Sequence, residues 1–234
     1  MNYKEGDIIQ FGSYPYYGDG RKRYINWKII ETDGKNFAVL LSCYAIDIFP
    51  YHAKLENITW EESGIRAWLN GKFYDNAFSV EEKKRIIPAS LKNNDSIGEF
   101  TQEYVDNWKI WGLDASSFLG TKWHTKGGND TSDKVWLLSL DDMKRYSGAF
   151  NTDKDRQLKS TPNIHSRYEY GNNKYAIKNG AEGNVWWWLR SPGIYQYSAA
   201  TVGPAGFITA NGSNVNNVYG GVRPAIKIGE KHKN

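Results

Sequence analysis

Three consecutive tryptophans near the C-terminus constrain most strongly how this 234-residue chain can fold. Trp186, Trp187 and Trp188 lead directly into Leu189. Side chains this bulky are held in place only when most of them are packed in a core. We therefore expect the core to reach the start of the segment 185–228, and the upstream chain to serve as its scaffold.

The residues after the tryptophan run are typical of short strands joined by tight turns. Val202, Ile208 and Val215 recur at short intervals among Gly, Ser, Asn and Ala. The ending GGVRPAIKI predicts a closing strand with Pro224 at its start or edge, where a missing amide does least harm. We expect these three residues and Val222 to point into the core, and the intervening positions to point outward.

Several motifs, in one order along the chain, resemble a bacterial family of uncharacterised domains with a C-type-lectin-like fold. The motifs are FGSYP, TWEES-x-I-R-x-WLN, GGNDTSDKVWLLS, WWWLRSPG and GGVRPAI, and only about residues 95–124 lie outside the resemblance. Some members of that family resemble the variable proteins of diversity-generating retroelements, whose C-terminal segment is rewritten by adenine-directed mutagenesis. The resemblance implies an α+β C-type-lectin-like fold with paired N- and C-terminal strands, two flanking helices and a display role.

Composition favours a single loop-rich domain, which we place at residues 1–230. Aromatic residues make up 15% of the chain, so apolar burial is concentrated in large rings rather than in long aliphatic runs. The 30 basic and 26 acidic side chains are mixed along the sequence, a pattern that favours a solvated surface over nucleic-acid binding. No apolar run is long enough to predict a signal peptide or a membrane span. The compartment stays open: cytoplasmic as given, or displayed on a surface or virion.

Strand signals are clearest in the first half of the chain. We expect strands at 7–11, 27–31 and 37–41, and another buried strand at 135–139. The residues 92–130 are rich in Asn, Gly, Ser and Asp, and they predict an irregular insertion whose scattered rings pin it to the body.

Helix starts are marked by capping residues. Thr59, with a glutamate three residues later, predicts the start of an amphipathic helix, and Ser79 predicts a second helix over 81–86 in the same way. Ser139 is expected to cap a short helix, and a further helical candidate follows Pro162.

Residue patterns for catalysis or metal binding are weak. The four histidines stand at no ligand spacing, and the loop GGNDTSD at 127–133 is ordinary turn chemistry rather than a calcium loop. Cys43 is the sole cysteine, and its apolar setting predicts a buried structural thiol. The paired-cysteine activity of formylglycine-generating enzymes, which share the lectin-like fold, therefore cannot be carried over. We predict no metal, no cofactor and no enzymatic activity, and we expect Arg190 and Arg223 to bond backbone carbonyls inside the core.

The candidate binding surface is a loop-built face between positions 194 and 219. Its residues are those that substitution at the adenines of Asn codons can yield, although ordinary loop drift gives the same assortment in a single sequence. Tyr, Ser, Gly and Asn also dominate antibody loops, because they combine rigid rings with adaptable hydrogen bonds. The candidate ligand-binding residues are Ile194, Tyr195, Gln196, Tyr197, Ser198, Thr201, Gly203, Pro204, Thr209, Ala210, Asn211, Asn216, Asn217 and Tyr219.

The function that the sequence favours is ligand binding by a display protein, with a protein or cell-surface ligand. The alternative is a calcium-independent carbohydrate-binding module that uses exposed Trp and Tyr rings as stacking platforms. Calcium-dependent sugar binding is disfavoured, since the Glu-Pro-Asn or Gln-Pro-Asp motif of such lectins is missing from the chain. An enzyme of the formylglycine-generating type is the least favoured class, and the oligomeric state stays open.

Overall fold

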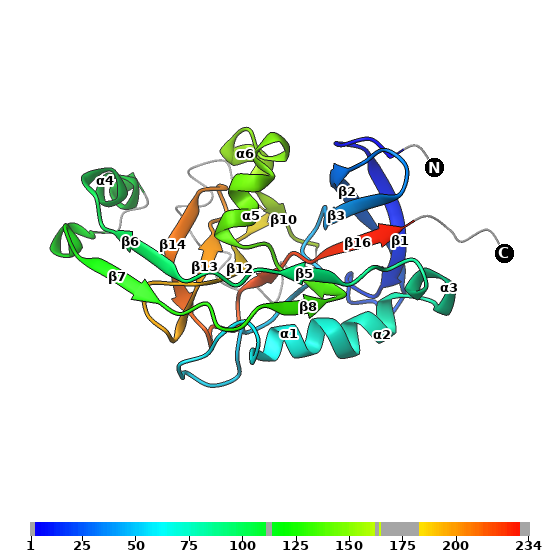
Figure 1. Cartoon of the computed structure of the whole chain (residues 1–234), viewed down its shortest axis with the longest axis horizontal. Coiled ribbons are helices and arrows are strands. Elements are labelled where there is room, and N and C mark those ends of the chain that lie inside the picture. Colours follow the sequence, from blue (N-terminus) through cyan, green and yellow to red (C-terminus); the bar gives the residue numbers. More distant parts are fainter. Residues whose placement is uncertain (1–2, 111–113, 162–163, 165–182, 230–234) are drawn as a thin grey trace.

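The computed structural model describes residues 3–110, 114–161, 164 and 183–229. As the sequence predicts, this part of the chain is mixed α+β, with two five-stranded sheets, three two-stranded ribbons and short helices. Figure 1 shows the two larger sheets next to each other along the long axis of the molecule. Buried side chains from both sheets form one hydrophobic core.

The first sheet is antiparallel throughout, in the order β1-β2-β3-β16-β9. The strands expected at 7–11, 27–31 and 37–41 are confirmed as its first three members. The turn between the second and third is held by Asp33, whose carboxylate accepts hydrogen bonds from the amides of Asn36 at 2.7 Å and Phe37 at 3.1 Å. The five strands are β1 (Ile8–Tyr14), β2 (Arg23–Thr32), β3 (Phe37–Ser42), β16 (Ala225–Gly229) and β9 (Val135–Trp136).

The C-terminal strand does not pair with the N-terminal strand, so that expectation is wrong. β16 lies between β3 and β9, and β1 forms the edge of the sheet. Ile226 and Ile228 of β16 are fully buried, whereas Ile8 of β1 is 65% exposed. The central position removes the most apolar surface from water, so the more apolar strand occupies it.

The second sheet has the order β14-β13-β12-β15-β4. Its strands pair antiparallel, except that β12 and β15 are parallel. All five residues of β13 are buried, and the edge strand β14 is half-buried along most of its length. The strands are β14 (Ile208–Asn214), β13 (Ser198–Val202), β12 (Trp187–Pro192), β15 (Gly221–Val222) and β4 (Asp47–Ile48).

Three antiparallel ribbons lie outside these sheets. In Figure 1 the ribbon β5–β8 crosses in front of the junction between the two sheets, above the helix formed by α1 and α2. The ribbons are β5 (Ala89–Leu91) with β8 (Thr131–Asp133), β6 (Ser96–Glu99) with β7 (Lys122–Thr125), and β10 (Leu158–Lys159) with β11 (Asn184–Val185).

The helices are short, and no helix in the described ranges is long and apolar enough to cross a membrane. The predicted caps at Ser79 and Ser139 are confirmed, because each side chain accepts a hydrogen bond from the amide three residues later. The helical candidate after Pro162 falls mostly outside the described residues. The helices are α1 (Gly64–Trp68), a π-helical turn (Leu69–Phe73), α2 (Tyr74–Ala77), α3 (Val80–Lys83), α4 (Gln102–Ile110), α5 (Leu140–Arg145) and α6 (Asp153–Arg156), with 3₁₀ turns at Ser116–Phe118 and Ser147–Ala149.

The first helix begins four residues later than predicted. Ser63, rather than Thr59, is its N-cap and accepts a hydrogen bond from the amide of Arg66 at 3.3 Å. Trp60 is 1% exposed, and its indole nitrogen donates to the buried carboxylate of Asp133 at 2.9 Å. This tertiary contact holds residues 60–62 in a turn, so the helix begins at Gly64, after that turn.

The insertion expected to be irregular at 92–130 contains the β6–β7 hairpin and helix α4, so that description is wrong. Its rings pack on one another, with Phe100 at the centre of a cluster 5.3 Å from Tyr104 and 5.4 Å from Trp123. The Tyr104 hydroxyl accepts hydrogen bonds from the edge-strand amides of Ala210 at 2.7 Å and Asn211 at 3.2 Å. The insertion is thus attached to β14, as the expected pinning by rings requires.

The tryptophan run lies in the core, as predicted. Trp187, Trp188 and Leu189 are fully buried, while Trp186 is half-buried and packs edge-on against Trp188 at 4.7 Å. The indole nitrogen of Trp187 donates to the carbonyl oxygen of Arg156 at 3.0 Å, and that of Trp188 to Phe49 at 2.9 Å. Three of the four aliphatic positions predicted to point inward are fully buried; Ile208 is only half-buried.

Replacing Leu189 by Ala is expected to lower the free energy of unfolding by about 2–5 kcal/mol, because it removes buried methyl groups from a packed core. The measurement is denaturant unfolding. Val218→Ala is the control: this side chain is 53% exposed, and its loss is expected to change stability by less than about 0.5 kcal/mol. Equal stability of the two variants would contradict the packing described here.

Candidate functional site

The residues predicted to form one binding face are divided between the two ends of the second sheet. β13 and β14 are antiparallel, with Ser198 opposite Asn214 and Val202 opposite Ile208. The turns at 194–197 and 215–219 therefore meet at one end, and the turn at 203–207 lies at the other. Five strand residues separate the two ends by about 16 Å, so a single continuous face from 194 to 219 is wrong.

Three of the candidate residues are buried and hold the scaffold. The Ser198 hydroxyl accepts a hydrogen bond from the amide of Tyr195 at 3.1 Å and donates to its carbonyl at 2.8 Å. Thr201 is 5% exposed in the middle of β13, and the amide of Gly203 closes the next turn onto the carbonyl of Phe207 at 2.8 Å. Strand pairing covers these positions, so they are closed to a ligand. The sequence alone does not reveal this pairing.

Gln196 and Asn217 are only partly exposed, and their amides fix loops. Gln196 accepts from the amide of Lys126 at 2.8 Å, and donates to the carbonyl oxygens of Lys126 at 2.9 Å and Ile58 at 3.3 Å. Asn217 accepts from the amide of Tyr219 at 3.0 Å. Tyr219 itself packs against the core. Both side-chain amides and the Tyr219 ring therefore fix the loops at this end of the second sheet. They do not form a freely adaptable surface.

The far-end candidates contact other parts of the chain. The Pro204 carbonyl accepts from the Asn184 side chain at 3.3 Å, and Thr209 hydrogen-bonds to Asn211. Ala210 and Asn211 lie against Tyr104 of the inserted helix, as described above. This end of the sheet is therefore partly covered by α4 and by the neighbouring turns.

Two stacked tyrosines lie at the near end, one exposed and one half-buried. The rings of Tyr195 and Tyr197 are parallel to within 6° and their centroids are 5.1 Å apart. Tyr195 is 45% exposed, Asn216 in the loop bonded to Tyr197 through Val215 is also exposed, and Tyr197 and Ile194 are half-buried. Neither phenol hydroxyl donates or accepts a hydrogen bond within the described part of the chain. We call Tyr195, Tyr197 and Asn216 the tyrosine face.

The tyrosine face rests on three loops joined by backbone hydrogen bonds. The amide of Val215 donates to the carbonyl of Tyr197 at 3.0 Å, and the amide of His52 donates to Val215 at 2.8 Å. The amide of Ile58 donates to Gln196 at 3.2 Å. Backbone hydrogen bonds thus join segments 51–58, 194–197 and 215–219, and these joined loops support the stacked rings.

Charges close to the tyrosine face are neutralised within the chain. The Asp95 carboxylate accepts from Lys126 Nζ at 2.8 Å, from the His124 ring at 2.7 Å and from the amide of Gly127 at 3.0 Å. The Lys126 and His124 contacts hold the pKa of Asp95 well below its usual range. His52 is likewise bonded to Glu56 at 2.8 Å. The face presents aromatic and amide groups rather than net charge.

The oxygens of the GGNDTSD loop are engaged by donors of the chain. Asp133 accepts from Trp60, from Arg66 Nε at 2.8 Å and from the Thr131 hydroxyl at 2.9 Å. Asp130 pairs with Lys92. No group of three or more His, Cys, Asp or Glu side chains is placed to hold a metal ion in the described ranges. The loop is a bonded structural turn.

Both arginines singled out by the sequence bond backbone carbonyls, as predicted. Arg190 donates to the carbonyl of Leu137 at 2.9 Å, and Arg223 to those of Ser42 and Arg156, each at 3.1 Å. Each arginine is 4% exposed. Full burial lowers the pKa of Arg223 to about 10.

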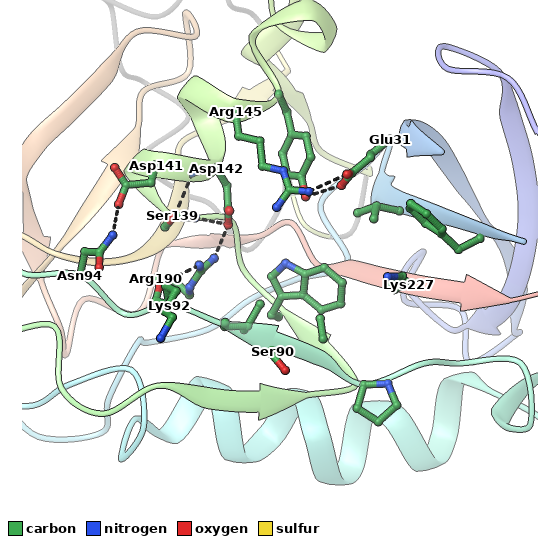
Figure 2. A pocket seen from close by; sticks show the side chains of 17 residues that line it. Glu31, Ser90, Lys92, Asn94, Ser139, Asp141, Asp142, Arg145, Arg190 and Lys227 are labelled. Atoms are coloured by element: carbon green, nitrogen blue, oxygen red, sulfur yellow. Dashed lines mark hydrogen bonds and ion pairs between the residues drawn. The ribbon is translucent and has the colours of Figure 1, made fainter. Parts of the chain in front are cut away.

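Sequence reasoning missed a cavity of about 630 Å³ whose lining includes none of the tyrosine-face residues (Figure 2). It lies between the first sheet, helix α5 and strand β5, and Trp136, Arg145 and Lys227 are among its lining residues. These residues are far apart in sequence and form no motif. The one available signal is Lys227, a charged residue between two buried isoleucines in the closing strand.

One family matches this chain by sequence: residues 35–229 match the family described as Domain of unknown function (DUF6273). No curated protein and no solved structure matches the chain.

Cys43 is expected to react slowly with thiol reagents in the folded protein. Burial raises the pKa of its thiol, so less of the reactive thiolate is present at pH 8 than in the unfolded chain. The measurement is the rate of reaction with a disulfide reagent, which is expected to be severalfold slower in the native state than in denaturant. A native rate equal to the denatured rate would show that the fold does not suppress the reactivity of Cys43. A catalytic role for this thiol would then have to be considered.

Proposed function

We propose that this chain, which belongs to the family described as Domain of unknown function (DUF6273), is a ligand-binding protein rather than an enzyme. In this proposal the scaffold is C-type-lectin-like and the tyrosine face contacts a protein ligand. The observation that carries the proposal is the parallel pair of exposed Tyr195 and half-buried Tyr197, whose hydroxyls bond to no described residue.

The chemistry of the tyrosine face suits protein recognition. A tyrosine ring offers a large contact area and restricts few torsions, and its hydroxyl adds a hydrogen bond at the rim of the contact. Stacking of Tyr195 on Tyr197 limits the motion of both rings before a ligand arrives. Less conformational entropy is then lost on binding, which favours affinity.

Support for a display role comes from the separation of the stacked rings from the core; neither ring belongs to the core cluster. Beneath the face, β13 is buried throughout, and Val215 in the adjoining loop is 1% exposed. Residues 195, 197 and 216 can therefore change while the buried positions keep the fold. This is the arrangement that a diversity-generating retroelement would require, restricted to fewer positions than the sequence predicts.

Glycines limit which positions could be diversified. Gly206 has a φ of +95°, and a Cβ there would lie 1.7 Å from the carbonyl oxygen of Asp153. Gly212 has a φ of +71°, and a Cβ would lie 1.9 Å from the carbonyl oxygen of Ala199. Both positions have to remain glycine in a display scaffold of this kind.

Carbohydrate binding without calcium is the second candidate. Exposed Tyr195 could present a ring face to a sugar, with the Asn216 amide beside it to bond hydroxyl groups. Tyr197 covers one face of that ring, so any sugar would have to use the other. Protein recognition, which uses ring edges and hydroxyls as well, accounts for the stacked pair more directly.

The test is a triple variant in which Tyr195, Tyr197 and Asn216 are all changed to Ala. Peptides are selected from a displayed random library against the parent protein, and their affinity for the variant is then measured. Since ligand-competent surfaces concentrate binding energy in a few aromatic residues, most selected peptides are expected to lose at least about tenfold in affinity. The variant is expected to lose less than about 1.5 kcal/mol of stability, since two of the three side chains are exposed and none belongs to the core cluster.

The matched control is the double variant Ile8→Ala with Val80→Ala, at two residues that are 65% and 71% exposed outside the face. Peptides that bind the triple variant as well as the parent would overturn the proposal, and so would a stability loss above about 3 kcal/mol. A glycan array with the same three proteins separates the second candidate. Sugar binding that the triple variant loses would favour a carbohydrate-binding module.

A further inference from the structure

The cavity beside helix α5 has the size of a small-molecule site and is separate from the tyrosine face. Its volume of about 630 Å³ lies within the range of roughly 300–1,000 Å³ that is typical of ligand pockets. Apolar walls are supplied by Phe37, Val39, Leu91 and Pro88. Figure 2 shows charged side chains around these walls, with Asp141 and Lys227 on opposite sides.

Strand register places the floor of the cavity on one face of the first sheet. Glu31 pairs with Val39, Val39 pairs with Lys227, and Ala225, two residues before Lys227, pairs with Trp136. Directly paired residues share a face, and so do residues two apart in a strand. The glutamate, the lysine and the tryptophan therefore project from the same side, while the intervening isoleucines of β16 enter the core.

Trp136 carries an indole N–H for which no described residue supplies an acceptor. Trp27, Trp60, Trp187 and Trp188 are also buried, and the indole nitrogen of each donates to an oxygen of the chain. Trp136 is 3% exposed, and its indole nitrogen donates no hydrogen bond to any described residue. Of these five tryptophans, Trp136 is thus the one whose N–H is available to an acceptor from outside the described chain.

The unbonded N–H of Trp136 opens into the cavity. Among the described residues, the only side-chain polar atom that is both fully enclosed and without a partner is Ser42 Oγ. The indole nitrogen is therefore accessible, although its ring is almost fully buried, and the space that Trp136 lines is this cavity.

Lys227 is the cation of the cavity that no acidic side chain neutralises within the described part of the chain. Arg145 pairs with Glu31 at 2.5 Å, Arg190 pairs with Asp142, and Lys92 pairs with Asp130 outside the cavity. The ammonium group of Lys227 lies 4.2 Å from the centroid of the Phe37 ring, a contact that leaves its hydrogen-bond donors available to an anion.

We propose that this cavity binds a small organic acid, with its carboxylate held by Lys227 and the indole N–H of Trp136, and its apolar body against Phe37, Val39 and Leu91. Diagonal neighbours on adjacent strands stand about 7–8 Å apart, which lets a long side chain and an indole reach one bound group. The ligand supplies the acceptor that Trp136 lacks and the negative charge that Lys227 lacks. This proposal is independent of the tyrosine face.

The test follows the indole N–H resonance of Trp136 by NMR in the full chain, assigned by its loss in Trp136→Phe. Benzoate, phenylacetate and indole-3-acetate are titrated against their neutral amides. The carboxylates are expected to shift this resonance at low millimolar or lower concentration, and the amides are expected to bind at least about tenfold more weakly, because charge-assisted hydrogen bonds are the strong ones.

Lys227→Met keeps most of the lysine stem and removes its charge, so it is expected to weaken carboxylate binding at least about tenfold. Lys84→Met, at the exposed lysine that caps the C-terminus of helix α3, is the control and is expected to bind like the parent. Binding to Trp136→Phe is followed by ligand-observed NMR and is expected to fall severalfold. If Lys227→Met does not fold, Lys227→Gln replaces it.

Three results would overturn the proposal. The first is that no carboxylate shifts the Trp136 resonance, and the second is that amides and carboxylates bind equally, which would show an apolar pocket only. The third is unchanged carboxylate binding in a folded Lys227 variant. Phenyl phosphate is titrated alongside, and tighter binding than every carboxylate would replace the assignment to an organic acid.

Discussion

The buried guanidinium of Arg190 joins parts of this fold that lie 48 to 98 residues away from it in sequence. It donates to the carbonyl of Lys92 at 3.2 Å, to the side chain of Asn93 at 3.2 Å and to the carbonyl of Leu137, and it pairs with Asp142 at the start of α5. A charge in this position is tolerated because all three guanidinium nitrogens donate to oxygens and one of these belongs to a carboxylate. Strand β12, helix α5 and the end of β5 are thereby held in one arrangement, which forms a wall of the cavity and sets the start of the loop that carries the stacked tyrosines.

Sequence patterns predicted the elements whose cause is local and failed where the cause is a distant partner. Ser79 and Ser139 cap helices because the bonded amide lies three residues away in the same segment. Thr59 has the same pattern, yet burial of Trp60 against Asp133 delays the helix to Ser63. The tryptophan run was predictable as core because no other environment accommodates such rings. The pairing of β16 with β3 could not be predicted, since an apolar strand pattern does not show which strands will lie on either side of it.

The candidate site was predictable as a segment but not as a surface. The choice of Tyr195 and Asn216 followed from residue type, and both are exposed. Ser198 and Thr201 have the same polar character and are buried, because their exposure depends on which strands flank β13. The cavity had no sequence signature, since Glu31, Trp136 and Lys227 meet only through strand register.

The contact of Tyr104 with the edge of the second sheet has a consequence for how copies of the protein meet. An edge strand with free amides is a template on which another strand can add, and this is a common start of aggregation. In β14 the amides of Ala210 and Asn211 are both bonded to one tyrosine hydroxyl, which no approaching backbone can displace without losing two hydrogen bonds. The inserted segment thus covers part of the sheet edge on which another strand could otherwise add.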